Sequence, residues 1–171
     1  MPRHNETQDR QPYPLTATRL TQMQTIAAID PGAKSGGIAI ADQAGIRLFK
    51  MPADPSELRD IIPFNATVVI EKVPPFVGRL IPSSAAFKLG KSAGWLEGFT
   101  QGRQQRLILV TPQAWQAGLG IPRGDRSQSQ WKGALKAEAA RRYPSTEGLT
   151  LQTSDALLML DWALRNPAAL G

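Results

Sequence analysis

A short β-branched segment, ATVVIEKV at residues 66–73, is apolar except for Glu71 and Lys72 near its end. Such a run is typical of a strand that is buried on both faces, as in parallel sheets covered by helices. A second apolar segment, QTIAAID at 24–30, ends on Asp30 just before a Pro-Gly turn. We expect the two segments to be neighbouring parallel strands of an α/β fold.

Turn residues and helix caps place further elements around these strands. Residues 36–41 and 46–50, separated by a turn, predict an antiparallel meander that begins with the strand at 24–30. The other predicted elements, in chain order, are a helix at 54–62 before Pro63, a helix at 83–99, a strand at 106–110, a short helix after Thr111 and Pro112, a helix from Ser127 or Ser129 to about Tyr143, and a helix at 152–165. The pattern predicts an α/β fold with a central mixed five-stranded sheet, three antiparallel strands and then parallel strands, flanked by helices.

Composition limits the class of protein. The 171 residues, 42% of them hydrophobic, suffice for one core, so we expect a single domain at 23–171 after a flexible polar arm at 1–22 that holds the only histidine, His4. The net charge of +6 favours an anionic partner, such as nucleic acid or a membrane surface. The absence of cysteine excludes disulfides, thiolate zinc sites and cysteine nucleophiles. The sequence predicts no transmembrane segment or signal peptide, and a soluble cytoplasmic protein fits.

Three acidic residues, Asp30, Glu71 and Asp155, lie among apolar residues, where an isolated charge is costly. The first two end neighbouring parallel strands, which is the edge of the sheet where ligands bind. The last helix is apolar almost all round, so we expect it to pack on the sheet and to bring Asp155 inward. Asp161 points about 120° away from Asp155 on a helix, which predicts a surface or capping acid.

Converging carboxylates repel one another, and a divalent cation removes that conflict. Oxygen ligands of this kind suit magnesium or manganese, and two such ions can activate a water for phosphodiester hydrolysis. Each acid alone also has an ordinary structural interpretation. Asp30 fits a turn, Glu71 could pair with Lys72 or Arg79, and Asp155 could cap a helix. Together, in a basic chain, the three favour a metal site.

Four motifs in the same order resemble those of one family. IDPGAKSGGIAI, VVIEKV and SDALLMLDWA are similar to the segments that carry its three acids, and SAAFKLGKSAG is similar to the helix after the second acid. Over residues 25–165 the chain resembles the RuvC family of Holliday junction resolvases, within the RNase H-like or retroviral-integrase superfamily, and specifically its phage-type members. The resemblance implies an RNase H-like nuclease domain.

The resemblance also implies an activity, that of a magnesium-dependent crossover junction endodeoxyribonuclease that leaves 5′-phosphate and 3′-hydroxyl ends. Asp30, Glu71 and Asp155 would be its catalytic metal ligands, with two Mg²⁺ ions for which Mn²⁺ can substitute. Arg126 corresponds to a basic residue near the scissile phosphate, and Phe76 to an aromatic residue at the junction core. Gln152 departs from the family, which has an acidic or histidine ligand three residues before the last aspartate. A glutamine carbonyl can bind magnesium, and this spacing predicts the same helix face as Asp155.

The positive charge is concentrated in two segments. Around the predicted helix at 83–99 lie Arg79, Lys88 and Lys91, and Lys88, Lys91 and Trp95 share a helical face that can meet a phosphate backbone, although core burial of Trp95 is favoured. Arg123, Arg126 and Lys132 flank the polar loop before the next predicted helix and can clamp phosphate. We expect strongly salt-sensitive binding of DNA by these residues.

A four-way junction has two strands to cut, so a resolvase needs two sites, most simply in a C2 homodimer. A stripe of small residues at Ala86, Gly90 and Gly94 could be a self-packing surface or could pack on its own sheet. The expected partner is four-way or branched DNA, with no membrane and no nucleotide cofactor, in a bacterial or phage-infected cell. Two alternatives stay open, namely a phage nuclease with broader branched-DNA or RNA-hybrid substrates and a catalytically weak junction-binding protein.

Overall fold

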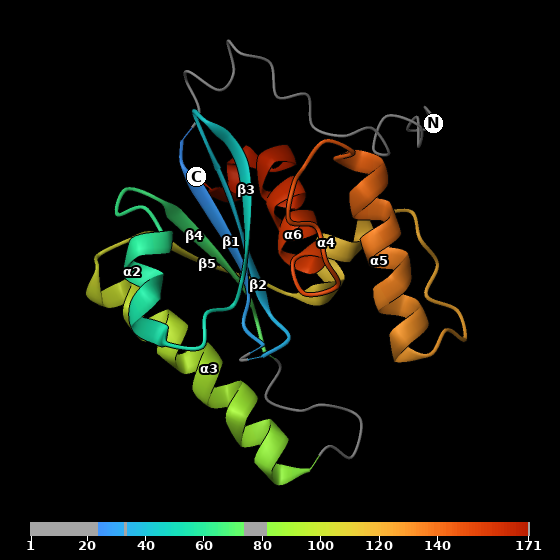
Figure 1. Ribbon diagram of the computed structural model, residues 1–171, viewed down its shortest axis with the longest axis horizontal. Helices are drawn as coiled ribbons and strands as arrows, with labels where there is room; N and C mark the ends of the chain where they lie inside the picture. The colour runs from blue at the N-terminus through green and yellow to red at the C-terminus, as the bar shows by residue number, and fades with distance from the viewer. Residues whose placement is uncertain (1–23, 33, 74–81, 171) are drawn as a thin grey trace.

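A five-stranded sheet forms the centre of the computed structural model, which describes residues 24–32, 34–73 and 82–170 (Figure 1). The strand order is β3-β2-β1-β4-β5. The strands are β1 (Ile26–Asp30), β2 (Gly37–Asp42), β3 (Gly45–Lys50), β4 (Thr67–Glu71) and β5 (Leu107–Val110). β1, β2 and β3 pair antiparallel, whereas β4 and β5 continue from β1 in parallel. The predicted mixed sheet is therefore confirmed.

Helices cover both faces of this sheet, as Figure 1 shows. The helical elements are η2 (Pro55–Glu57), α2 (Leu58–Ile61), α3 (Ser83–Gly102), α4 (Pro112–Ala117), α5 (Gln128–Arg142), α6 (Ser154–Arg165) and α7 (Pro167–Leu170). α6 packs on β1 and β2, and α5 packs on α6, whereas α2 and α3 lie on the opposite face. Alternate residues of β1 serve the two cores, since Ala28 joins the core under α6 and Ile29 joins the core under α3.

Local caps explain where several helices begin. The Thr111 hydroxyl accepts a hydrogen bond from the amide of Ala114, with Pro112 in the first turn of α4. Ser127 and Gln130 form a reciprocal capping box at the start of α5. Both starts agree with the predicted elements, because these signals are local and are read from a few neighbouring residues.

The last long helix begins two residues later than the sequence predicts. The Thr153 hydroxyl accepts from the amide of Thr150 at 2.8 Å, and the amide of Gln152 donates to the Thr150 hydroxyl at 3.2 Å. These side chains offer the backbone an alternative to helical bonding, so residues 151–153 form a turn and α6 starts at Ser154. Gln152 therefore precedes the helix and does not share its face. The short α7 was not predicted.

Asp161 is not the surface or capping acid that the sequence predicts, because α5 covers it. Its side chain is buried and accepts hydrogen bonds from Arg142 Nη1 and from the Tyr143 hydroxyl, both at 2.6 Å. Arg142 is itself buried and also contacts Glu138, and Arg165 lies 3.0 Å from Asp161. Burial, together with the adjacent Asp161 charge, raises the pKa of Tyr143, which keeps the phenol protonated as a donor. The ion pairs join α5 to α6.

The first half of α3 extends beyond the sheet, as Figure 1 shows. Trp95 is 39% exposed and stacks on Phe99 with ring centroids 5.3 Å apart, so the expected core burial of Trp95 is wrong. A Cβ built at Gly90 or Gly94 would meet no described atom within 4 Å. The alternative that the small-residue stripe packs on its own sheet is therefore also wrong, because the helix axis leads away from the sheet.

The predicted arm at 1–22, with His4, lies outside the described residues. In the described ranges, every helix is too short or too polar to cross a membrane.

We predict that Asp161→Asn lowers the free energy of unfolding by about 3–5 kcal/mol, because it removes the buried negative charge that pairs with Arg142 Nη1 and leaves Glu138 as the carboxylate beside the buried guanidinium. Urea denaturation at pH 7 measures the change. Asp42→Asn is the matched control, since Asp42 pairs with the exposed Arg47 and should cost no more than about 1 kcal/mol. Equal losses in both variants would contradict the role of the buried pair.

Candidate active site

Asp30 and Glu71 end the two central strands and point to the same face of the sheet. Ile29 of β1 pairs with Ile70 of β4, so the acids that follow them stand on adjacent parallel strands, which run about 4.8 Å apart. Ala28 and Val69 face the core under α6, and side chains alternate along a strand. Asp30 and Glu71 therefore face α6 at the carboxyl edge of the sheet, as the sequence predicts.

Gly37 allows the start of α6 to reach this edge, and Gly36 allows the loop after β1 to pack on the Asp30 backbone. Gly37 pairs with Asp30 across β1 and β2, and a Cβ built at Gly37 would lie 2.5 Å from the Gln152 carbonyl oxygen. A Cβ at Gly36 would lie 2.2 Å from the Asp30 carbonyl oxygen. A larger residue at position 37 would push the turn before α6 away from β2, whereas one at position 36 would clash with the backbone of Asp30 and Gly32. Gly37 thus lets the first turn of α6, with Asp155, lie over the strand ends.

Lys132 of α5 links Asp155 to Asp30. Its ammonium group donates a short hydrogen bond to Asp155 Oδ2 and lies 3.8 Å from Asp30 Oδ2. The Asp155 and Asp30 side chains are 7% and 14% exposed, and that of Lys132 is 31% exposed. A positive charge therefore lies between two nearly buried carboxylates, which places strand and helix acids within one site.

Trp115 of α4 holds the third carboxylate. Its indole nitrogen Nε1 donates to Glu71 Oε2 at 2.9 Å, and the indole is otherwise packed in the core under α6. On the other side of the site, the amide of Gly32 donates to Asp30 Oδ1 at 3.3 Å. Glu71 is thus held by a group distant in the chain and Asp30 by its own local turn, and both contacts restrict the carboxylate rotamers.

The electrostatics show how closely the acids lie. Burial, reinforced by the negative charge of Asp155, raises the pKa of Asp30 to about 6, although Lys132 opposes the shift. Burial and the charges of Asp30 and Asp155 raise the pKa of Glu71 to about 7, against the Trp115 hydrogen bond and Lys132. Burial opposes ionisation of Lys132, but the charges of Asp155, Asp30 and Glu71 outweigh it and raise the pKa of the ammonium. The site favours an added positive charge.

The donor set fits a hard divalent cation. It consists of carboxylate oxygens that repel one another when all three groups are ionised. Binding of Mg²⁺ or Mn²⁺ relieves this repulsion. As the side chains stand, no three acidic, histidine or cysteine side chains of the described residues enclose a metal position. Lys132 supplies the compensating charge in this arrangement, so a cation that enters must displace the ammonium from at least one carboxylate.

Gln152 lies at the rim of this site and not among the three acids. Its Nε2 donates to the Lys34 carbonyl at 2.7 Å, which ties the loop after β1 to the turn before α6. This contact gives the side chain a structural function. Its assignment as a further metal ligand stays a prediction.

The remaining predicted DNA contacts lie on two exposed regions. Arg123 and Arg126 are exposed in the loop before α5, where Arg123 lies over the Trp131 ring at 5.5 Å and Arg126 donates to the Pro122 carbonyl. Lys88 and Lys91 are exposed on α3, on the other side of the sheet. Phe76 and Arg79 lie outside the described residues.

Two contacts were missed from the sequence. Lys132 was assigned to DNA binding, and its place between Asp30 and Asp155 depends on the packing of α5 against α6, which no local pattern reveals. Trp115 was assigned no function at the site. A tryptophan in a short helix directly after a parallel strand was the available signal, because such a helix starts at the ligand-binding edge.

The fold matches that of known structures. Thermus thermophilus RuvC bound to a Holliday junction substrate superposes with a TM-score of 0.56 and 14% identity, over 85% of this chain and 96% of that one. A second Thermus thermophilus RuvC structure gives a TM-score of 0.51 and 16% identity, over 84% and 95%. No protein-family model matches the sequence, and no curated protein does. At 14% and 16% identity the comparison shows the fold alone, and this chain has a RuvC-like, RNase H-like fold.

We predict that the metal-free protein becomes less stable as the pH rises from about 4 to about 7. The folded state raises the pKa of Asp30 and Glu71 above their usual values, so it binds more protons than the unfolded state in this window. The expected fall in unfolding free energy is about 2–4 kcal/mol. Denaturant unfolding in EDTA measures it, and Mg²⁺ should reduce it.

In the same experiment Glu71→Gln should flatten the pH dependence, because one of the two raised carboxyl groups is gone. The same substitution at the exposed Glu57 is the control and should keep the wild-type slope. A slope that is identical in Glu71→Gln would contradict the assignment.

We also predict that Lys132→Met tightens Mn²⁺ binding by roughly tenfold, because it removes the charge that competes for Asp30 and Asp155. Isothermal titration calorimetry measures the affinity. Lys136→Met, at an exposed position of the same helix, is the charge-matched control. Weaker Mn²⁺ binding by Lys132→Met would show that the lysine supports the cation and does not compete with it.

Proposed function

We propose that this protein is a metal-dependent endonuclease that cuts four-way or otherwise branched DNA. The observation that carries the proposal is the cluster of Asp30, Glu71 and Asp155 at the carboxyl edge of a RuvC-like sheet, with electrostatic interactions among all three. A set of largely buried carboxylates that repel one another lowers stability. Binding of a divalent cation by an enzyme would account for such a cluster.

The three carboxylates would hold Mg²⁺, or Mn²⁺ in its place, as the oxygen ligands of a two-ion site. When bound, the cation supplies positive charge to the scissile phosphate and makes a water molecule more acidic. Trp115 keeps Glu71 oriented through its indole hydrogen bond. Lys132, once released from Asp155, carries an ammonium group that can contact a phosphate oxygen beside the site.

The reaction is hydrolysis of a phosphodiester. A water oxygen forms a new bond to phosphorus, and the bond between phosphorus and the 3′ oxygen breaks. The 3′ oxygen takes up a proton, which leaves a 3′-hydroxyl and a 5′-phosphate. Exposed Arg123 and Arg126, in the loop before α5, would hold the flanking phosphates.

Branched DNA is proposed as the substrate because of the fold and the charge. The protein of the first similar structure was solved with a Holliday junction substrate. Positive residues lie on both sides of the sheet in this chain, with Arg123, Arg126 and Lys132 on one side and Lys88 and Lys91 on the other. A surface of this kind can contact more than one DNA arm, with strong dependence on salt.

Two cuts on one junction require two sites, and we propose a C2 dimer formed through α3. Phe87 is 71% exposed, and on the same side of the helix Gly90 and Gly94 leave open space above their backbone. A second copy of the helix could approach closely along this stripe and bury Phe87. A dimer of this kind would relate the two sites by symmetry.

A junction-binding protein without efficient cleavage is the second candidate. Lys132 occupies the space between Asp30 and Asp155, and the Gln152 amide is bonded to the Lys34 carbonyl. Both contacts would have to change before a cation had a full set of ligands. The two candidates share the fold and the DNA surface and differ in catalysis alone.

Cleavage of labelled synthetic four-way junctions with Mg²⁺ tests the proposal. We predict paired, symmetry-related nicks with 5′-phosphate ends. Asp30→Asn, Glu71→Gln and Asp155→Asn should each lower the rate on the order of a thousandfold, since each removes several kcal/mol of charge stabilisation. Asp60→Asn, at an exposed aspartate, is the matched control.

Three other outcomes of this assay would each contradict a part of the proposal. Tight junction binding with no cleavage in Mg²⁺ or Mn²⁺ would establish the second candidate. Faster cleavage of RNA–DNA hybrids than of junctions would establish a nuclease with a different substrate. Single, unpaired nicks would contradict the dimer.

A further inference from the structure

A groove lies between α3 and the segment that joins β3 to α2. It encloses about 240 Å³. Its lining is mostly apolar and consists of Met51, Pro52, Ala53, Pro55, Leu58, Leu96 and Trp95, with Ser92, Lys88 and Lys91 from α3. Lys88, Lys91 and Trp95 are exposed to solvent, whereas Leu58 and Leu96 are buried. The groove thus combines an aromatic wall, an apolar floor and a basic rim.

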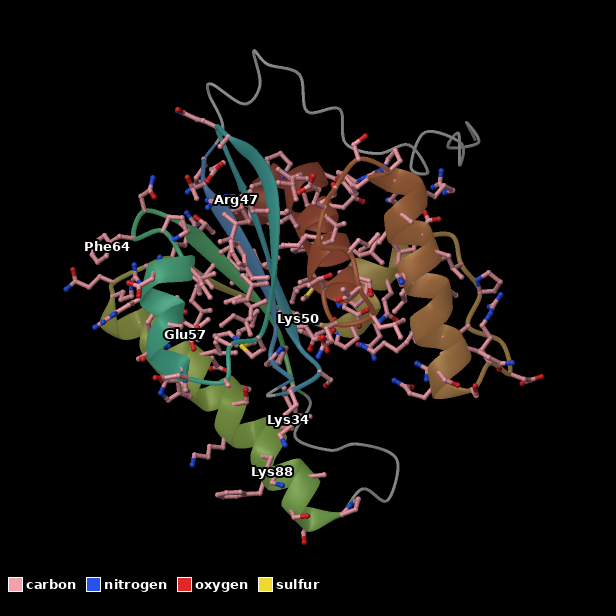
Figure 2. The ribbon with its side chains drawn as sticks, viewed as in Figure 1. Lys34, Arg47, Lys50, Glu57, Phe64 and Lys88 are labelled. Carbon is pink, nitrogen blue, oxygen red and sulfur yellow. The ribbon has the colours of Figure 1, made fainter. Side chains whose placement is uncertain are left out.

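The groove and the carboxylate site lie at the same end of the sheet, on opposite faces. The amide of Met51 donates to the Gly36 carbonyl at 3.1 Å, and Gly36 packs directly on the Asp30 backbone. Met51, Leu58 and Leu96 belong to the core under α3, whereas Asp30 and Glu71 face α6. Figure 2 shows Lys34 and Lys88 toward this end of the molecule and Arg47 toward the other end. A strand that leaves the carboxylate site around the sheet edge would meet the groove.

We propose that this groove binds an unpaired nucleotide of the DNA, with its base stacked on Trp95 and its phosphates on Lys88 and Lys91. An indole face is a stacking platform for any base, and the Phe99 ring that stacks on the indole supports it. A single base is smaller than the drug-sized ligands that fill larger pockets. Lysines bind phosphate as point charges and leave the sequence of the base unread.

The chemistry of the lining selects this occupant over others. None of the described residues that line the groove is acidic, so a basic peptide or a cation has no partner there. An apolar side chain of a second copy would fill the floor but leave the two ammonium groups without an anion. An unpaired nucleotide satisfies the aromatic wall and the basic rim together, and branched DNA offers unpaired or unstacked bases at its branch point. The inference rests on the proposed function for the source of that nucleotide.

Binding in EDTA tests the groove without any dependence on cleavage. The probes are a short oligothymidylate that carries one 2-aminopurine, a four-way junction and a linear duplex, all read by fluorescence anisotropy. Trp95→Ala should weaken binding of the oligothymidylate and the junction about tenfold and leave the duplex unchanged. The 2-aminopurine fluorescence should be quenched by the wild-type protein and should stay high with Trp95→Ala.

Two further variants separate stacking from folding and from charge. Trp95→Phe keeps an aromatic face and should retain most of the affinity. Lys88→Gln combined with Lys91→Gln should weaken oligothymidylate binding and lower its salt dependence. That variant loses two positive charges. The charge-matched control is a second double variant that combines Arg47→Gln, at the far end of the sheet, with Lys136→Gln on α5. The control should bind the oligothymidylate as the wild type does.

Equal binding of the oligothymidylate by Trp95→Ala and wild type would overturn the inference. A loss that is the same for duplex would also overturn it, because a fully paired strand has no free base. If Trp95→Ala instead converts a dimer to a monomer in analytical ultracentrifugation, the groove is occupied by a second copy and the inference is wrong. Groove binding that persists in a protein that never cleaves would sink the proposed function alone.

Discussion

The mutual repulsion of three carboxylates, one buried and two partly buried, and the ammonium that offsets it, is the interaction on which the site depends. Asp30, Glu71 and Asp155 come from two strands and a helix, and Lys132 comes from a second helix. Burial in a medium of low polarity strengthens every one of these charge interactions. The position of each element around the carboxyl edge of the sheet therefore affects the charge interactions of the groups on the other elements.

The packing of α6 and α5 sets this geometry. Gly37 lets the turn before α6 lie against β2, which brings Asp155 over the strand ends. The buried pair between Arg142 and Asp161 joins the C-terminal end of α5 to α6, and the N-terminal half of the same helix α5 brings Lys132 to the carboxylates. A buried polar network of this kind favours one relative placement of two helices, which apolar contacts alone define less sharply. The geometry of the carboxylate site thus depends on a second group of ion pairs, that between Arg142 of α5 and Asp161 of α6.

The two faces of the sheet have different parts in the proposed function. The face under α4, α5 and α6 holds the carboxylates, whereas the face under α2 and α3 holds the groove at Trp95. Alternation of side chains along β1 and β4 is the reason, because residues 30 and 71 must point to the face opposite Ile29 and Ile70. One sheet edge consequently offers charge chemistry on one side and an aromatic, basic surface on the other.

The sequence by itself determined the order and type of nearly all elements, the mixed sheet, and the edge at which Asp30 and Glu71 meet. These follow from local composition, from helix caps such as Ser127, and from the handedness of crossovers. The tertiary structure alone decided that Asp161 is buried, that Trp95 is half-exposed, and that Lys132 lies between two acids. The physical reason is that burial and ion pairing depend on which other element covers a residue, and a helical period describes only the element's own face.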